Sequence, residues 1–352
     1  MKKTLAALIV SAFAASAANA AVVYDNEGTK VELGGSLRLI MEKADKKVYD
    51  AANHSTKKAN SALRNAGSRF GVKVKHNLDN DFYALGNLEL RFDDTTSRDK
   101  FGGAYAKRAY VGLGSQSVGE IKFGRQLTIA DDLSQANDYE YGLIPKGDYI
   151  PTSGTGVVRY DYKGIEGLQL SANYNFGQKN DEKGKALDPA IKNAFGFGAL
   201  YTAGDLDARF AYGHTSFETD ASYKHRLDGF LASLGYKFGD FTLTGDFGYA
   251  HEKENDAKTN KFYVSPGFAY QVTPASQVYG NYLYERVKGE TTKDKTHGFL
   301  LGADYKLHKQ VVVFLEGKYV TTKNYAENAN GGYAYHGKTK DRAIGVGMRV
   351  YF

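Results

Sequence analysis

The sequence predicts an all-β fold, an antiparallel up-and-down transmembrane β-barrel of about 16 strands. Three observations support this fold. Every second residue from Ile344 to Phe352 is large and apolar, so a period of two continues to the last residue. Short turns alternate with long polar connections along the chain, and the N-terminus has the pattern of an export signal. A barrel can end on such a strand because its last strand pairs with its first and leaves no open edge.

The first 20 residues carry the export signal. Two lysines precede an apolar run over residues 5–15, and Ala18-Asn19-Ala20 forms a small-x-small cleavage site. The run is shorter than the roughly 20 apolar residues that a membrane-spanning helix needs. We therefore expect residues 1–20 to be a signal peptide and residues 21–352 to form one barrel domain.

The strands are predicted by short segments in which apolar residues alternate with polar ones. In chain order we expect them at residues 30–42, 67–77, 80–93, 103–114, 118–126, 156–163, 167–177, 193–203, 205–217, 227–238, 240–251, 261–272, 276–288, 296–307, 310–322 and 340–352.

The connections between these strands differ in length on the two sides of the barrel. Tight turns such as Ala203-Gly204-Asp205 consist of Gly, Pro, Asn and Asp residues. The long connections are expected at Lys43–Ala66, Gln126–Thr155, Gln178–Lys192 and Lys323–Thr339. Short turns on one side and long loops on the other distinguish an outer-membrane barrel from a soluble β-sandwich.

Each strand has an apolar and a polar face. Phe230, Leu234 and Phe238 share one face, as Val311 and Leu315 do further along the chain. The opposite face is polar and carries most of the charged residues. A barrel of roughly 16 to 18 strands is wide enough for an aqueous channel, so this face should line a wet lumen.

Composition and motifs exclude several other classes. The chain of 352 residues has no Cys, so disulfides do not stabilise it, and its net charge of +6 is too small to indicate a nucleic-acid partner. His251-Glu252-Lys253-Glu254 has poor spacing for metal ligands, and no Gly-x-Ser-x-Gly motif is present. We therefore expect no enzyme activity, no metal and no cofactor.

A series of short motifs runs in order along the whole chain. They are Val31–Arg38, Ser68–Gly71, Lys107–Gly114, Gly119–Arg125, Val158–Asp161 with Gly167-Leu168, and the terminal Phe352. This set resembles Gram-negative trimeric general-diffusion porins, especially the major porins of the Pasteurellaceae. The resemblance implies a passive, water-filled outer-membrane pore for ions and small hydrophilic solutes. It also implies a homotrimer, contact with outer-membrane lipid and lipopolysaccharide, and a barrel-assembly machinery that reads the C-terminal strand and Phe352.

The resemblance further implies that the third loop, Gln126–Thr155, folds inward and narrows the pore. Its acidic residues would face basic residues on the wall. The wall positions are expected to be Arg38, Arg69, Arg108 and Arg159, and the loop positions Asp131, Asp132, Asp138, Glu140 and Lys146. A structural ion pair is the alternative role for each wall arginine.

The sequence departs from the family pattern at two places. The family's first-strand Lys falls on Ser36, where Arg38 is the nearest substitute, and Lys146 stands beside the Leu143-Ile144-Pro145 core of the loop where the family has Glu. These changes favour a near-neutral pore or a slight preference for anions. Two other functions stay open: a solute-specific channel, and a surface adhesin or antigen whose long loops bind host ligands.

Overall fold

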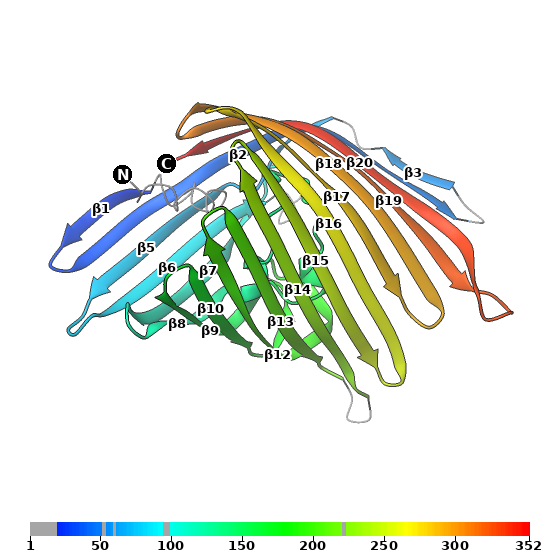
Figure 1. Cartoon of the computed structure of the whole chain (residues 1–352), viewed down its shortest axis with the longest axis horizontal. Coiled ribbons are helices and arrows are strands. Elements are labelled where there is room, and N and C mark those ends of the chain that lie inside the picture. The colour runs from blue at the N-terminus through cyan, green and yellow to red at the C-terminus, as the bar shows by residue number, and fades with distance from the viewer. Residues whose placement is uncertain (1–19, 51–53, 59–60, 94–98, 220–222) are drawn as a thin grey trace.

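The computed structural model describes residues 20–50, 54–58, 61–93, 99–219 and 223–352, which form one closed antiparallel β-barrel of 16 wall strands (Figure 1). Closure is achieved at β2 (Thr29–Asp50), which pairs with β20 (Tyr333–Tyr351) on one side and β5 (Arg69–Asn77) on the other. The predicted fold and strand number are thus confirmed. The predicted signal peptide lies, except for Ala20, outside the described residues. Among the described residues, no helix is long and apolar enough to cross a membrane.

The remaining elements follow in chain order. They are β1 (Ala21–Asn26), β3 (His54–Lys58), β4 (Ala62–Asn65), β6 (Phe82–Asp93), β7 (Gly103–Ser115), β8 (Gly119–Leu127), the 3-10 helices η1 (Ile129–Asp132) and η2 (Lys146–Asp148), β9 (Ser153–Ile165), β10 (Leu168–Asn175), β11 (Gln178–Asn180), β12 (Ala186–Ala203), β13 (Leu206–Phe217), β14 (His225–Phe238), β15 (Phe241–Glu254), β16 (Ala257–Thr273), β17 (Ser276–Lys288), β18 (Thr292–His308) and β19 (Val311–Glu327).

Some wall strands consist of more than one labelled segment. β3, β4 and β5 follow one another along β2, and β10 and β11 follow one another along β12. β1 continues the line of β20 along β2, so the first described strand lies end to end with the last one (Figure 1). Gly35 of β2 lies at this junction and exchanges both backbone hydrogen bonds with Phe352, at 2.9 and 3.2 Å.

Several strands are longer than the sequence predicts. β2 continues to Asp50 and β20 begins at Tyr333, so much of the predicted loops Lys43–Ala66 and Lys323–Thr339 is strand. The predicted loop Gln178–Lys192 likewise contains β11 and the start of β12. These extensions are polar on both faces, because they continue past the apolar band, and they therefore lack the alternation that identifies a membrane strand.

The inward and outward faces agree with the predicted alternation. Leu234 is 55% exposed while its neighbour Ser233 is 4% exposed, and Leu315 is 48% exposed while Glu316 is fully buried. An exposed apolar band therefore surrounds the barrel, as contact with lipid requires. The buried apolar residues lie inside the barrel, where the connection between β8 and β9 packs on the wall.

Candidate functional site

The connection of residues 128–152, which we call the lumen loop, lies against the inner face of the wall strands. Two of its apolar side chains, Ile129 and Ile150, are almost fully buried. They fit the wall because the facing positions on the strands are glycines. A Cβ atom at Gly213 would lie 2.4 Å from Ile150, and one at Gly229 would lie 2.0 Å from the Tyr149 carbonyl oxygen. The glycines therefore form the surface on which the loop rests.

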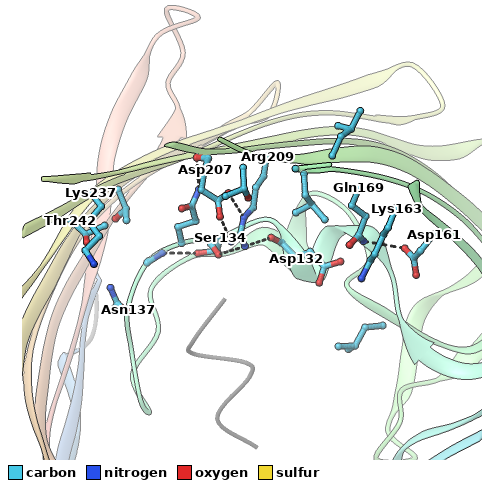
Figure 2. A pocket seen from close by; sticks show the side chains of 18 of the residues that line it. Asp132, Ser134, Asn137, Asp161, Lys163, Gln169, Asp207, Arg209, Lys237 and Thr242 are labelled. Carbon is cyan, nitrogen blue, oxygen red and sulfur yellow. Dashed lines mark hydrogen bonds and ion pairs between the residues drawn. The ribbon is translucent and has the colours of Figure 1, made fainter. Parts of the chain in front are cut away.

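The first part of the lumen loop is held by two arginines of the wall, of which Figure 2 labels Arg209. Arg159 of β9 donates to the Thr128 carbonyl at 3.0 Å and to the Asp132 carboxylate at 2.7 Å. Arg209 of β13 donates to the Asp132 carbonyl at 2.8 Å and is itself paired with Asp207. These guanidinium groups hold the start of the loop in place.

The middle of the lumen loop is anchored by one buried carboxylate. Glu316 of β19 is fully buried and accepts hydrogen bonds from the backbone N–H groups of Tyr139, Glu140 and Tyr141 at 2.6–2.8 Å. The Tyr279 hydroxyl donates to the same carboxylate at 2.8 Å. Charge-assisted hydrogen bonds of this kind are the stronger ones, so Glu316 is the principal attachment of the loop.

The returning part of the loop is held by aromatic residues. The Tyr149 hydroxyl donates to Glu285 at 3.1 Å, and its ring meets the edge of Tyr263 at a centroid distance of 4.9 Å. Burial and the neighbouring Glu285 raise the pKa of Tyr149. The hydroxyl therefore stays protonated and keeps its role as donor.

A cavity of about 520 Å³, which we call the constriction cavity, lies between the middle of the loop and the wall. Its lining residues include Arg38, Arg64, Arg69, Arg91 and Arg349 from the wall, Tyr139 and Glu140 from the loop, and Asp93.

The arginines of this cavity have different surroundings. Arg64 pairs with Glu42 and with Glu140, at 2.7 and 2.6 Å. In the described part of the chain, Arg38 and Arg69 have no carboxylate within ion-pair distance; they bond to the Ser36 hydroxyl and the Gly67 carbonyl. The charge of these two groups is therefore not neutralised locally.

Arg349 is a third arginine that lines this cavity without an ion-pair partner among the described residues. It donates to the Tyr139 carbonyl, and its guanidinium lies 4.7 Å from the centre of the Tyr139 ring. Its Nε atom is buried and has no hydrogen-bond partner within the described residues. Arg349 thus links the loop to the wall, and no carboxylate of the described residues lies within ion-pair distance of it.

A larger cavity of about 820 Å³ lies toward the short turns (Figure 2). Its charged residues are mostly paired. Asp161 bonds to Arg159 at 3.0 Å and to Lys122 at 2.6 Å, and the Arg209–Asp207 pair also lines the cavity. This vestibule is therefore closer to electrical balance than the constriction cavity.

The predicted site residues divide between these surroundings. Arg38, Arg69 and Glu140 line the constriction cavity, whereas Arg108, Arg159 and Asp132 line the larger vestibule. Asp131 pairs with Lys146 at 3.7 Å, and Asp138 is exposed; neither Asp131, Asp138 nor Lys146 lines either cavity.

Sequence reasoning missed three arginines of the constriction cavity. Arg91 and Arg349 fall on the predicted polar face, but no family motif marks them. Arg64 lies in the predicted loop Lys43–Ala66. The signal that could have identified it is the short alternation of β4, in which Leu63 points outward and is 54% exposed. No group of three or more His, Cys, Asp or Glu residues suited to a metal ion occurs among the residues that the structure describes.

A model of the Gram-negative porin family matches residues 4–325. The chain is 32% identical over 381 aligned positions to the major outer membrane protein of Pasteurella multocida strain Pm70, with 100% of both chains covered. A second Pasteurella multocida major outer membrane protein is 31% identical, again over 100% of both chains.

Solved porin structures have the same fold. The outer membrane protein OmpT of Vibrio cholerae superposes with a TM-score of 0.70 at 19% identity, covering 94% of this chain and 99% of that one. The anion-selective porin from Comamonas acidovorans gives a TM-score of 0.63 at 18% identity, with 92% and 100% covered. With a closed barrel, a charged lumen and relatives matched from end to end, the chain belongs to the Gram-negative porin family and forms a passive diffusion pore in the outer membrane.

Proposed function

We propose that the constriction cavity is the selectivity filter of this pore and that it favours small hydrophilic anions. The observation that carries this proposal is an excess of guanidinium charge. Arg38, Arg69 and Arg349 face the cavity without a described carboxylate partner. The two acids that line the cavity are paired with other cations, because Glu140 pairs with Arg64 and Asp93 pairs with Lys183.

Selectivity then follows from electrostatics and size rather than from a tight binding site. The lumen loop narrows the channel, and its position brings Tyr139 and Glu140 opposite the arginines. A hydrated anion passing through exchanges part of its water for guanidinium N–H donors, which present a broad and permanently charged surface. Within one narrow passage, charges lie closer together than the screening length of about 8 Å at physiological salt. We infer that no covalent chemistry takes place.

We also propose that three barrels assemble into a trimer. A trimeric form of Vibrio cholerae OmpT has the same fold, with a TM-score of 0.69 at 20% identity. Contact with lipopolysaccharide, and recognition of the terminal strand by the barrel-assembly machinery, remain parts of this proposal.

The proposed filter is tested by the reversal potential across a planar bilayer that separates two different KCl concentrations. We expect a reversal potential whose sign identifies chloride as the more permeant ion. A potential of zero, or one of the opposite sign, would reject anion preference. Conductance rising in steps of three would support the trimer, and single steps only would contradict it.

A further inference from the structure

Three hydrogen-bonded side chains stand on the outer face of β13 and β14. The His214 Nδ1 atom lies 2.7 Å from the Asp228 Oδ1 atom, and the His214 Nε2 atom lies 3.1 Å from the Ser216 hydroxyl oxygen. We call these three residues the outer triad. An ionised carboxylate only accepts hydrogen bonds, so it keeps the proton of the neutral ring on Nδ1. The lone pair of Nε2 then faces the serine hydroxyl and can accept its proton.

The outer triad is built by strand pairing and by the period of a strand. His214 and Ser216 are two residues apart on β13, so they share one face, and Asp228 of β14 is directly opposite His214. The shared face is the outer one, because Phe210 and Phe230 lie on it and are 38% and 36% exposed. No short sequence motif marks the arrangement, since the aspartate comes from the neighbouring strand.

The histidine and the aspartate are held in place from further sides. The His214 ring stacks on the Phe195 ring of β12, with a centroid distance of 5.3 Å and an angle of 28° between the rings. The Tyr212 hydroxyl donates to the same Asp228 oxygen at 2.9 Å, and Arg226 lies 3.8 Å from the other one. The side chains of His214 and Asp228 are 21% and 28% exposed, so the triad is packed but accessible.

N–H donors flank the serine on both neighbouring strands. Ser216 is directly opposite Asn193 of β12 and directly opposite Arg226 of β14. The Cβ atoms of directly opposite residues are about 5 Å apart, so an amide and a guanidinium can reach a group that is bound to the serine. Donors of this kind stabilise the negative oxygen of a tetrahedral intermediate. A nucleophile, a base, an orienting carboxylate and oxyanion donors are therefore present together.

The outer triad lies at the external end of its strands. The short turns at residues 204–205 and 239–240 mark the periplasmic end of β13 and β14. The triad lies at the opposite end, beside the longer connection of residues 218–224.

A row of aromatic residues separates the outer triad from the centre of the lipid band. Tyr212 is directly opposite Phe230, and Phe230 is directly opposite Tyr249, two residues along the strands from the triad. Aromatic side chains gather where hydrocarbon meets water. The triad therefore stands at the height at which a lipid carries the ester bonds of its acyl chains.

We propose that the outer triad hydrolyses the acyl esters of lipids, a second activity of the barrel besides permeation. The substrate class follows from the position of the triad, because it shares a face with the apolar band and borders the aromatic row. A lipid that covers the band brings its ester carbonyl to the serine without leaving the membrane. The reaction takes place outside the lumen, so the passage of solutes still involves no covalent step.

The reaction follows the roles of a serine, histidine and aspartate triad. The Ser216 hydroxyl oxygen attacks the ester carbonyl carbon while His214 Nε2 takes its proton. The ester C–O bond then breaks, and His214 gives the proton to the leaving alcohol. Water attacks the acyl-serine and gives a proton to His214, which returns it to the Ser216 oxygen as the fatty acid leaves. Asp228 is a positioning residue, because it keeps the ring in the required tautomer.

Refolded protein in micelles of a detergent without ester bonds tests this activity. The probes are phosphatidylethanolamine with ester-linked chains, the same lipid with ether-linked chains, and a fluorophosphonate that labels activated serines. The native protein should release fatty acid from the ester lipid only and should be labelled. Ser216→Ala should abolish release and labelling. Asp228→Asn should slow release about 100-fold or more, whereas Asp228→Glu should restore part of the rate.

A matched control removes a serine hydroxyl elsewhere. Ser117 is exposed and bonds to Asp81, so Ser117→Ala should keep the native rate of release. Channel conductance of Ser216→Ala should stay near the native value, which shows that the variant folds and separates this test from that of the filter. No release by the native protein, equal labelling of Ser216→Ala, or a native rate in Asp228→Asn would each overturn the proposal.

Discussion

At the scale of single residues, five arginines line the constriction cavity but contribute unequally to its field. Arg64 is neutralised by two carboxylates, and Arg91 pairs with Glu89 at 2.6 Å. Arg38, Arg69 and Arg349 have no carboxylate within ion-pair distance among the described residues, so their charge is not offset by a partner. The number of arginines therefore overstates the positive potential, and the arrangement of partners determines it.

The first prediction reverses one of these charges. Arg69→Glu should shift the permeability ratio toward cations by about threefold or more, because two units of charge change within a screening length of the permeating ion. Reversal potentials in a KCl gradient measure the shift. The same reversal at Arg226, which faces outward from β14 with its side chain 56% exposed, should have little effect. An unchanged reversal potential in the Arg69 variant would remove this arginine from the conducting path.

Part of this site could be predicted from the sequence. Arg38 and Arg69 are predictable from the sequence because they fall on the polar face of their strands and within recognisable motifs. Arg64 was not, because its strand is only four residues long and lies within a polar stretch. Arg64, the partner of Glu140, is distant in sequence, and only the folding of the loop across the lumen brings the two together.

At the scale of elements, part of the fit between the lumen loop and the wall is made by the backbone. Glu316 binds three consecutive N–H groups, and glycines on β13 and β14 let the loop approach. Neither feature leaves a pattern in the loop sequence. The length of the connection was therefore predictable, but its attachment points were not.

The second prediction removes this attachment. Glu316→Ala leaves three N–H groups and the Tyr279 hydroxyl without their acceptor and should cost about 3 kcal/mol or more. Single-channel recordings should show larger conductance and more open-channel noise, because the loop moves away from the constriction. Glu316→Gln keeps an acceptor oxygen and should be milder on both readouts. A quiet channel of native conductance in the alanine variant would show that other contacts hold the loop.

The third prediction concerns the two faces of a strand pair. Leu234→Arg places a charge on the exposed apolar band and should destabilise the barrel by about 2–4 kcal/mol if the site is near the membrane midplane. Thr244→Arg, on the neighbouring rung but lining the vestibule, should cost much less. Urea unfolding in liposomes compares the two. Equal losses would mean that the assignment of inner and outer faces is wrong at this level.

At the scale of the whole molecule, closure depends on the first and last strands. β20 pairs with β2 over most of its length, and Phe352 completes the ladder at Gly35. The terminal apolar alternation was enough to predict this arrangement, because a strand that reaches the last residue needs a partner. The polar ends of the long strands were less predictable, since nothing in their composition separates them from loops.

The fourth prediction tests closure. Deleting Phe352 removes both hydrogen bonds to Gly35 and the aromatic ring packed beside it, so the amount of folded, heat-modifiable protein in outer membranes should fall severalfold. Phe238→Ala removes an exposed aromatic residue from a turn at the same end and is the matched control, which should assemble normally. Native amounts of the deletion variant would show that the terminal residue is dispensable for assembly.

The anchoring of the lumen loop by Glu316 has a consequence for the evolution of the pore. Because this carboxylate binds main-chain N–H groups, these three hydrogen bonds do not depend on which side chains occupy positions 139–141. The side chains add contacts of their own, such as the hydrogen bond from the Tyr141 hydroxyl to Glu42 at 2.8 Å. A substitution at one of these positions removes only the contacts of that side chain and keeps the three main-chain hydrogen bonds to Glu316. The side chains that line the cavity can therefore vary while these main-chain attachments keep the loop at the same place on the wall.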